Sequence, residues 1–563
     1  MKKGGTYIGK VIKNDFPNKG IVEYIEKNED GEIRNLIVVK GALEGQTVEF
    51  MLTKKRHGKS EGRLMNVVEK SHLQTREPVC PHFNICGGCV YQELEYSTQL
   101  EFKSNMVKSI IDEVVKDEYE FEGILGSPCE WEYRNKMEFS FGDEYMNGPL
   151  ALGLHKKDSF YDIVSLKSCR IVNNDYNIIV ENTLKFFEER KIPFYHKMKH
   201  TGYLRHLLVR RSVKNGGILV ALVTTSDFEA DTCGGVTKTD LLESYKNMII
   251  GLELDGEVKG VLHIVNDGLA DMVASDYTEV LFGEDFITET ILGLNFKIST
   301  FSFFQTNSLG AEVLYEKARS YVGETKDKVI FDLYSGTGTI AQMLAPVAKK
   351  VVGVEIIEEA VEAAKINASL NGLTNCEFIA GDVLKVIDEI EEKPDLIVLD
   401  PPRDGINPKA LSKIIEYGVD RLVYISCKPT SLARDLVMLQ ERGYKVENVS
   451  CVDMFPHTHH VETVCLLSKL HEAKHHVNVT LDMDELDITS AESKATYEEI
   501  KEYVLKKHGL QVTNLYIAQV KRKCGIIERE NYNKSKLEAA KQPQCPEDKE
   551  KAIRDALEHF GMV

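Results

Sequence analysis

The 563-residue sequence lacks the features of a membrane or secreted protein. No run of eighteen or more apolar residues occurs, so no segment has the length of a membrane-spanning helix. The opening segment MKKGGTYIGK has two lysines but no apolar stretch behind them, so it does not resemble a secretory signal. We therefore expect a cytoplasmic, monomeric protein without membrane contacts, whose twelve cysteines are reduced, five of them for metal binding or catalysis and the other seven as structural residues.

The sequence also lacks an overall excess of basic residues, since its net charge at pH 7 is −18. Such a charge argues against indiscriminate binding to nucleic acid, DNA included. The basic residues are nevertheless distributed unevenly along the chain, and residues 190–214 contain eight Lys or Arg residues without an Asp or Glu. Because phosphate contacts depend on the local potential, we predict an RNA-binding groove lined by Arg205, Arg210 and Arg211. A solvated charged surface is the alternative.

The chain is too long for one domain, and its patterns change along its length. Short alternating segments such as TYIGKVI and QTVEFML predict a small barrel of the OB type, with a basic loop at residues 54–59. The predicted parts are a barrel at 1–70, a central α+β domain at 71–300, an α/β domain at 301–470, a linker at 471–494 and a helical extension at 495–563. In the extension, the basic triplet at residues 521–523 is either an RNA contact or a solvated helix end.

Two matched C-x-x-C pairs, the usual arrangement of a zinc ribbon, are absent. Instead, five residues separate Cys80 from Cys86 and two separate Cys86 from Cys89, while a fourth candidate, Cys169, lies far along the chain. Four thiolates hold either zinc or an iron–sulfur cluster. The pair Gly87-Gly88 lets backbone N–H groups approach bridging sulfides, which favours the cluster.

A dinucleotide fingerprint is incomplete, because Ala341 stands where a third glycine is expected. The strand VIFDLY nevertheless runs into Ser335-Gly-Thr-Gly-Thr339 and a helix, and the next strand ends in Glu355. An acidic residue at the end of the strand that follows the glycine turn and helix commonly accepts hydrogen bonds from ribose hydroxyls. Asp382 and Asp400, the latter opening DPPR, end the following two strands, so ligand-binding groups should gather at one edge of the sheet.

The stretch LVYISCKPTSLARDL predicts a buried strand, then Cys427, then a helix whose N-cap is Thr430 or Ser431. Backbone N–H groups at a helix start favour a thiolate over a thiol, and Lys428 adds positive charge. The alternative is a buried structural cysteine, a common environment for this residue type.

The motifs FQTN, DLYSGTGT, GVE, LDPPR, SCKPTSLARDL and FPHTHHVETV occur in that order. Together they resemble the uridine-5 RNA methyltransferases that use S-adenosylmethionine (SAM). The barrel and the cysteine spacing resemble the branch that acts on 23S ribosomal RNA, whereas the tRNA branch resembles only the catalytic half. The resemblance implies an α/β, Rossmann-like class I methyltransferase domain behind a TRAM-type barrel and a central α+β domain.

The resemblance also implies the residues that carry the reaction. It implies a 4Fe–4S cluster on Cys80, Cys86, Cys89 and Cys169, and SAM contacts from Gln305, Tyr334, Glu355 and Asp400. The nucleophile maps to Cys427 and the general base to Glu462. The chemistry requires such a pair, because carbon 5 of uracil becomes nucleophilic only after thiolate addition at carbon 6, and a base must then remove its proton. The target uridine is expected to be flipped out or single-stranded.

Three alternatives remain open at this stage. A tRNA uridine-5 methyltransferase shares the catalytic motifs. A radical enzyme would combine a cluster with SAM, but the usual C-x3-C-x2-C spacing is absent. An RNA-binding protein without catalysis would use only the barrel and the basic face. The histidines near Glu462 (His457, His459 and His460) predict a hydrogen-bonding loop more readily than a metal site, since no matching carboxylate or cysteine spacing accompanies them.

Overall fold

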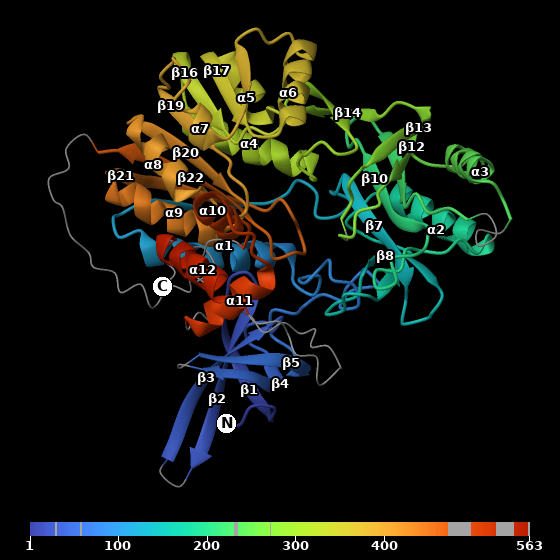
Figure 1. Ribbon diagram of the computed structural model, residues 1–563, viewed down its shortest axis with the longest axis horizontal. Coiled ribbons are helices and arrows are strands. Elements are labelled where there is room, and N and C mark those ends of the chain that lie inside the picture. Colours follow the sequence, from blue (N-terminus) through green and yellow to red (C-terminus); the bar gives the residue numbers. More distant parts are fainter. Residues whose placement is uncertain are drawn as a thin grey trace. The chain divides into compact units, whose positions relative to one another are not determined.

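The computed structural model describes residues 1–28, 31–56, 59–229, 235–270, 272–470, 497–524 and 545–560 (Figure 1). The chain forms two compact units, Met1–Ala473 and Lys474–Val563. Within the described ranges, no helix is both long enough and apolar enough to cross a bilayer. The linker expected at 471–494 lies outside these ranges.

The first five strands close into a barrel in the order β1-β2-β3-β5-β4. They are β1 (Thr6–Asp15), β2 (Lys19–Asn28), β3 (Gly31–Lys40), β4 (Thr47–Arg56) and β5 (Lys59–Glu69). Alternate side chains such as Val22, Ile37 and Phe50 point inward and are fully buried, as strand geometry requires. The predicted OB-like barrel is confirmed. Of its expected basic loop, His57 and Gly58 lie outside the described residues.

The central part is a seven-stranded sheet in the order β13-β12-β11-β10-β7-β8-β9. Its strands are β7 (Lys136–Asp143), β8 (Leu150–His155), β9 (Ile163–Ser165), β10 (Leu204–Arg211), β11 (Gly217–Thr224), β12 (Glu257–Val265) and β13 (Tyr277–Gly283). Two helices, α2 (Asn174–Glu189) and α3 (Lys238–Ile250), share its apolar core, where the rings of Phe187 and Tyr245 lie 5.2 Å apart. The α+β architecture is therefore as expected.

The arginines predicted to line an RNA groove lie inside this part of the protein. Arg205 is 4% exposed and donates to the backbone oxygens of Asn266, Gly268 and Ala270. Arg210 is 2% exposed and donates to the backbone oxygens of Thr300 and Ser302. Arg211 pairs with the buried Asp175 at 2.8 Å. The groove prediction was wrong for these residues, because their guanidinium groups satisfy buried backbone carbonyls and a buried carboxylate.

The catalytic part is an eight-stranded sheet in the order β18-β17-β16-β19-β20-β22-β21-β6. Its strands are β6 (Glu120–Leu125), β16 (Thr325–Leu333), β17 (Ala348–Glu355), β18 (Cys376–Ala380), β19 (Leu396–Leu399), β20 (Arg421–Ser426), β21 (Tyr444–Val452) and β22 (Glu462–Lys469). Its helices are α4 (Ser308–Val322), α5 (Thr339–Leu344), the 3-10 helix η1 (Ala345–Val347), α6 (Glu358–Leu370), α7 (Val383–Val386), α8 (Pro408–Glu416) and α9 (Pro429–Glu441). Strands β16 to β20 are parallel, whereas β22 runs antiparallel to β20. The predicted Rossmann-like sheet is confirmed.

Residues 96–125 belong to a different part of the fold from the central domain predicted for them. Strand β6 pairs with β21 in the catalytic sheet. The helix before it, α1 (Tyr96–Val114), buries Val107 and Ile111 in the same apolar cluster as Leu432 of α9. Residues 96–125 therefore complete the catalytic layer instead of the central domain at 71–300. Sequence patterns give the apolar face of a helix but not its partner.

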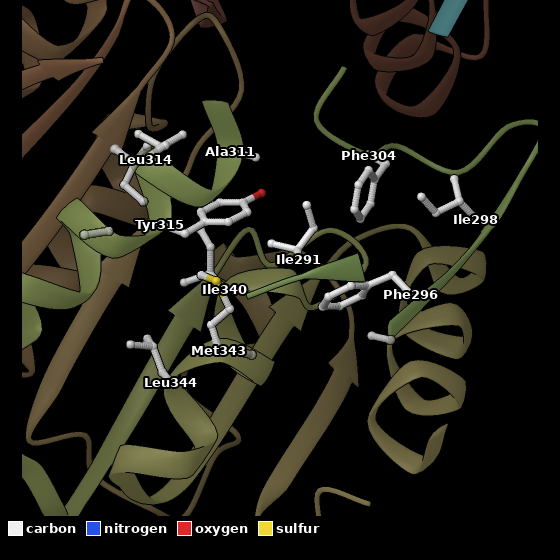
Figure 2. Close-up of a cluster of buried hydrophobic side chains, with 14 of the residues drawn as sticks. Ile291, Phe296, Ile298, Phe304, Ala311, Leu314, Tyr315, Ile340, Met343 and Leu344 are labelled. Carbon is white, nitrogen blue, oxygen red and sulfur yellow. The ribbon is translucent and has the colours of Figure 1, made fainter. Parts of the chain in front are cut away.

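A hairpin stands between the two sheets, formed by β14 (Phe286–Ile291) and β15 (Leu294–Ser299). Figure 2 shows side chains of this hairpin, such as Ile291 and Phe296, meeting Tyr315 of α4 and Ile340 of α5. The cluster continues to Phe304, so the segment before α4 is packed in place. This packing fixes α4 and the glycine turn before α5 relative to each other.

A buried ion pair ties α1 to the chain just before Glu462. Lys103 and Asp453 are both inaccessible, with Nζ and Oδ1 2.7 Å apart, and Lys103 also donates to the backbone oxygen of Phe455. We expect Lys103→Met to lower the free energy of unfolding by about 3–5 kcal/mol, because it leaves a buried carboxylate without its partner. The matched change Lys108→Met breaks an exposed pair on the same helix and should cost within about 1 kcal/mol. Urea denaturation of the two variants measures the difference, and equal small losses would contradict the expectation.

The C-terminal unit contains three helices in its described part, as predicted. They are α10 (Tyr497–His508), α11 (Asn514–Lys523) and α12 (Glu547–His559), with a core that includes Ile500, Ile517 and Ile553. Lys521 of the proposed RNA-contacting triplet is 5% exposed. Lys523 pairs with Glu550. Lys521 is therefore buried, whereas Lys523 stays exposed in a surface ion pair.

Candidate active site

Parallel strands bring the predicted ligand-binding residues to one edge of the catalytic sheet. Tyr334 follows β16, Glu355 ends β17, Asp400 follows β19 and Cys427 follows β20. Because these strands are neighbours in the sheet, their carboxyl ends open on a common crevice, where ligands of such sheets bind. The structure thus gathers residues that are almost a hundred positions apart in the chain.

The glycine turn between β16 and α5 has a left-handed backbone. Tyr334, Gly336 and Gly338 have φ angles of 68°, 54° and 72°. A Cβ atom at Gly338 would lie 2.5 Å from the ring of Phe378, so close packing excludes a side chain there. At Gly336, by contrast, a Cβ atom would meet nothing within 4 Å, so this glycine faces open space. The open side of the turn leaves backbone exposed that a ligand could approach closely.

Glu355 holds the glycine turn from the next strand. Its carboxylate accepts hydrogen bonds from the backbone N–H groups of Gly336 and Ile357, both at 3.0 Å. Each oxygen keeps a lone pair for a further donor such as a ribose hydroxyl. Gln305 lies in a segment that contacts the glycine turn. The Thr337 hydroxyl donates a hydrogen bond of 3.4 Å to the backbone oxygen of Phe303, two residues before Gln305. Asp382 instead caps α7 through the N–H of Leu384, a role the sequence did not predict.

Cys427 and Glu462 face each other across two antiparallel strands. Ser426 at the end of β20 pairs with Thr463 at the start of β22. Cys427 directly follows this last pair on one strand, and Glu462 directly precedes it on the other. The charge of Glu462 acts on the Cys427 thiol, so the two side chains lie near each other. The neighbouring strand ends expected from the sequence are therefore present.

The surroundings of Cys427 oppose the predicted thiolate. Burial raises the pKa of the Cys427 thiol to about 11, and the carboxyl groups of Glu462 and Asp400 add to the rise. Helix α9 also begins at Pro429, with Lys428 as N-cap, rather than after Thr430 or Ser431. The helix start predicted to stabilise a thiolate is thus outweighed by desolvation and by two acidic neighbours. These surroundings favour a neutral thiol at Cys427.

The two carboxyl groups beside Cys427 are unusually basic. Burial raises the pKa of Glu462 to about 8, with a further rise caused by Asp400. Burial alone raises the pKa of Asp400 to about 7. Deeper in the sheet, burial raises the pKa of Asp332 to about 8, although one of its oxygens accepts from the N–H of Ala341 at 2.9 Å. A carboxyl group with a pKa near the working pH is suited to proton transfer.

Arg403 is the functional residue that the sequence reasoning left without a role. Its positive charge lowers the pKa values of both Cys427 and Glu462, which places the guanidinium near both groups. Its Nη2 lies 3.1 Å from Nδ1 of His460, and its backbone oxygen accepts from the Ser431 hydroxyl at 2.8 Å. The motif LDPPR contains it, so a search for cations next to strand-end acids would have found it.

The histidines form a packed loop, as the sequence favoured. His457 is fully buried, and its ring stacks on Trp131 with centroids 3.7 Å apart. The rings of His459 and His460 lie 4.3 Å apart. In the part of the chain that the structure describes, no group of three or more His, Cys, Asp or Glu side chains has the geometry of a metal site.

The four predicted cluster ligands nevertheless lie together. Burial raises the pKa of the Cys89 thiol to about 12, and the thiols of Cys169, Cys86 and Cys80 add to the rise. The backbone amides of Gly88 and Cys89 act to lower the pKa of the Cys86 thiol, and those of Ile171 and Val172 act to lower the pKa of the Cys169 thiol. Such donors stabilise thiolates, so the donor set fits a metal cofactor, although the four sulfurs are not in metal-binding geometry here.

A pH titration of alkylation tests the neutral thiol. With a pKa of about 11, only about one Cys427 in 10⁴ is a thiolate at pH 7. Because the thiolate is the form that reacts, iodoacetamide should label Cys427 slowly at pH 7 and about tenfold faster per pH unit up to pH 10. Mass spectrometry of the Cys427 peptide measures the rate, with Cys427→Ser as the unlabelled control. A rate that is already constant between pH 6 and 8 would show a thiolate and contradict this pKa.

Comparisons with known proteins agree with this geometry. The family model described as tRNA (Uracil-5-)-methyltransferase matches residues 269–470. An uncharacterized RNA methyltransferase of Clostridium acetobutylicum is 47% identical over 469 residues, which span 83% of this chain and 99% of the relative. Another, from Caldanaerobacter subterraneus, is 45% identical over 83% of this chain and all of its own length (100%).

A solved structure extends the likeness beyond the catalytic sheet. The tRNA (uracil-54, C5)-methyltransferase of Pyrococcus abyssi, in complex with S-adenosyl-L-homocysteine, matches with a TM-score of 0.62 and 26% identity. The match covers 82% of this chain and 99% of that chain. The expectation that tRNA enzymes resemble only the catalytic half was therefore wrong, since the overlap is far longer than residues 301–470. On the family match, the relatives and the shared fold, the chain belongs to the SAM-dependent RNA uracil-5 methyltransferases.

Proposed function

We propose that this enzyme methylates carbon 5 of a uridine in 23S ribosomal RNA through a covalent bond between Cys427 and the uracil ring. The observation that carries the proposal is that Cys427 and Glu462 both adjoin the last pair of β20 and β22, Ser426 with Thr463, and that the charge of Glu462 acts on the Cys427 thiol. A nucleophile and a basic carboxylate in reach of one ring are the two groups that this reaction needs.

The reaction follows from these groups. Sγ of Cys427 bonds to carbon 6 of uracil while its S–H proton, held by a thiol of raised pKa, passes to solvent water, and the ring takes up the negative charge as an enolate. Carbon 5 of the resulting enolate then attacks the methyl group of SAM. The methyl group is transferred to carbon 5, and S-adenosylhomocysteine is the leaving group. Glu462 removes the remaining proton from carbon 5, and the bond between carbon 6 and Sγ breaks to release the product. Arg403 favours the charged forms of both residues by lowering their pKa values.

The SAM site consists of the strand-end residues around the open face of Gly336. Glu355 is positioned for the ribose hydroxyls, since its carboxylate already holds the glycine turn. Gln305, Tyr334 and Asp400 complete the contacts, with Asp400 between the cofactor and the Cys427 thiol whose pKa it raises. We assign these roles from position and from the family's motifs.

A 4Fe–4S cluster is proposed on Cys80, Cys86, Cys89 and Cys169. Support comes from the mutual proximity of the four thiols and from backbone amides near two of the sulfurs, which act to lower the pKa of Cys86 and of Cys169. When bound, the cluster would supply a crosslink between the 80–89 segment and the chain at Cys169. Iron and sulfide analysis of anaerobically purified protein tests this, with Cys89→Ser expected to lose both and Cys129→Ser expected to keep both.

The choice of 23S ribosomal RNA rests on the barrel, taken as a TRAM-type RNA-binding domain, and on the cysteine spacing. Transfer RNA is the second candidate, because the P. abyssi relative is by its title a tRNA enzyme and spans most of this chain. Transcripts of each RNA, incubated with methyl-labelled SAM, distinguish the two. We expect label in 23S ribosomal RNA at a uridine that is unmethylated in a deletion strain. Label confined to tRNA would overturn this substrate assignment and leave the catalytic residues unaffected.

A further inference from the structure

The cysteine segment and the loop that precedes Glu462 are joined directly, although more than 350 residues separate them in the chain. The backbone oxygen of His457 accepts hydrogen bonds from the N–H groups of Val90 and Tyr91, at 2.7 and 3.1 Å. Val90 is the residue after Cys89. A single carbonyl group therefore connects the proposed cluster segment to the loop of the proposed base.

His457 is held on every side. Its N–H donates to Oε1 of the buried Gln99 at 2.9 Å, and its Nδ1 lies 3.2 Å from Nε2 of the same amide. The ring stacks on Trp131, and Nε2 lies 3.4 Å from a carboxylate oxygen of Glu130. Its backbone is left-handed, with φ 65°, a conformation that non-glycine residues keep only where the surroundings enforce it.

The loop between His457 and Glu462 is short and internally bonded, so a shift at one end reaches the other. The Thr458 hydroxyl donates to the oxygen of Phe455 at 2.8 Å and accepts from the N–H of His460 at 3.2 Å. His460 in turn contacts Arg403, and the buried Val461 leads into Glu462. Several contacts separate the His457 side chain from Glu462, so His457 acts on Glu462 through the backbone of the loop.

We propose that His457 is a positioning residue that locks the loop carrying Glu462 to the segment Cys86–Tyr91, so that an ordered cysteine segment is required to place the catalytic base. This inference rests on the proposed function. It assigns the cysteine segment a role in proton removal from carbon 5, a step that thiol addition and methyl transfer do not need. The defect caused by loosening the lock should therefore be confined to the last step of the reaction.

Two RNA substrates separate the steps. RNA with 5-fluorouridine has no removable proton at carbon 5, so it traps the methylated Cys427 adduct whether or not Glu462 is well placed. RNA with ordinary uridine forms a lasting adduct only when proton removal is slow. The variants are His457→Asn, which tolerates the left-handed backbone but loses the stacked ring, and Gln99→Met, which removes the amide that holds His457.

We expect both variants to trap 5-fluorouridine RNA at the wild-type rate within about twofold, and to accumulate denaturant-stable adduct on ordinary RNA. Their turnover should fall by about 10²-fold, the scale of an ångström-sized misplacement of a catalytic group. The control Tyr176→Phe, which removes a buried hydroxyl on α2 outside the loop and the cysteine segment, should behave as wild type. Equal losses on both RNAs, or no adduct on ordinary RNA, would overturn the positioning role. Failure of the wild type to trap 5-fluorouridine RNA would instead refute the proposed function.

Discussion

Replacing Glu462 with Gln should leave the enzyme covalently attached to methylated RNA. Glutamine keeps the size and the hydrogen bonding of the side chain but cannot accept the proton from carbon 5. Cys427 then adds to the ring and the methyl group transfers, but the adduct cannot eliminate. Turnover should fall by about 10²–10⁴-fold, the usual contribution of a general base.

The measurement follows methyl-labelled SAM into a denatured complex of protein and RNA. In the Glu462→Gln variant the label should migrate with the protein, whereas in the wild type it should migrate with free RNA. Glu447→Gln is the matched control. This half-buried carboxyl group on β21 accepts a hydrogen bond from the Ser468 hydroxyl and lies at the end of the β21–β22 pair that is opposite to Glu462. An inactive Glu462→Gln enzyme without adduct would show that Glu462 is needed before or during thiol addition.

A methyl group added at Gly336 should weaken SAM binding strongly. Gly336→Ala places its Cβ atom on the open face of the glycine turn, where we place the cofactor. Gly372→Ala is a closely matched control, because Gly372 also has a positive φ, of 65° against 54°, and also meets nothing within 4 Å. Both variants therefore carry the same backbone strain, of about 1 kcal/mol.

Calorimetric titration with SAM separates the steric effect from the strain. We expect Gly336→Ala to bind at least about tenfold more weakly, which corresponds to about 1.4 kcal/mol of binding free energy. Gly372→Ala should bind as tightly as the wild type, although both variants should unfold at similarly lower urea concentrations. Equal SAM affinities for the two variants would place the cofactor elsewhere.

The sequence was sufficient for the parts of the site that are local in the chain. A strand followed by Gly336 and Gly338 and then a helix permits few structures, and Glu355 at the end of the next strand is placed by the right-handed crossover between parallel strands. The pairing of Cys427 with Glu462 followed from family motifs and from their positions at strand ends. In the structure, the antiparallel strands β20 and β22 bring the two residues to the same end of the strand pair.

The sequence was insufficient where the outcome depends on neighbours from distant segments. Arg205 and Arg210 belong to a run of cations that looks solvated, yet carbonyl groups some sixty to ninety residues away satisfy them inside the fold. The acid–base state of Cys427 also depends on surroundings, since burial and two carboxyl groups from other strands outweigh the helix start next to it. Patterns along a chain record which residues can be buried, but not the dielectric or the charges that they will meet.

The claim on which the account depends is the covalent bond between Cys427 and uracil. It is tested most directly by incubating the enzyme with SAM and 5-fluorouridine RNA, digesting both polymers and analysing the peptides by mass spectrometry. The account predicts one modified peptide, which carries a methylated fluorouridine nucleotide on Cys427 and is absent from Cys427→Ala. An adduct on another cysteine, or methylated RNA without any protein adduct, would contradict it.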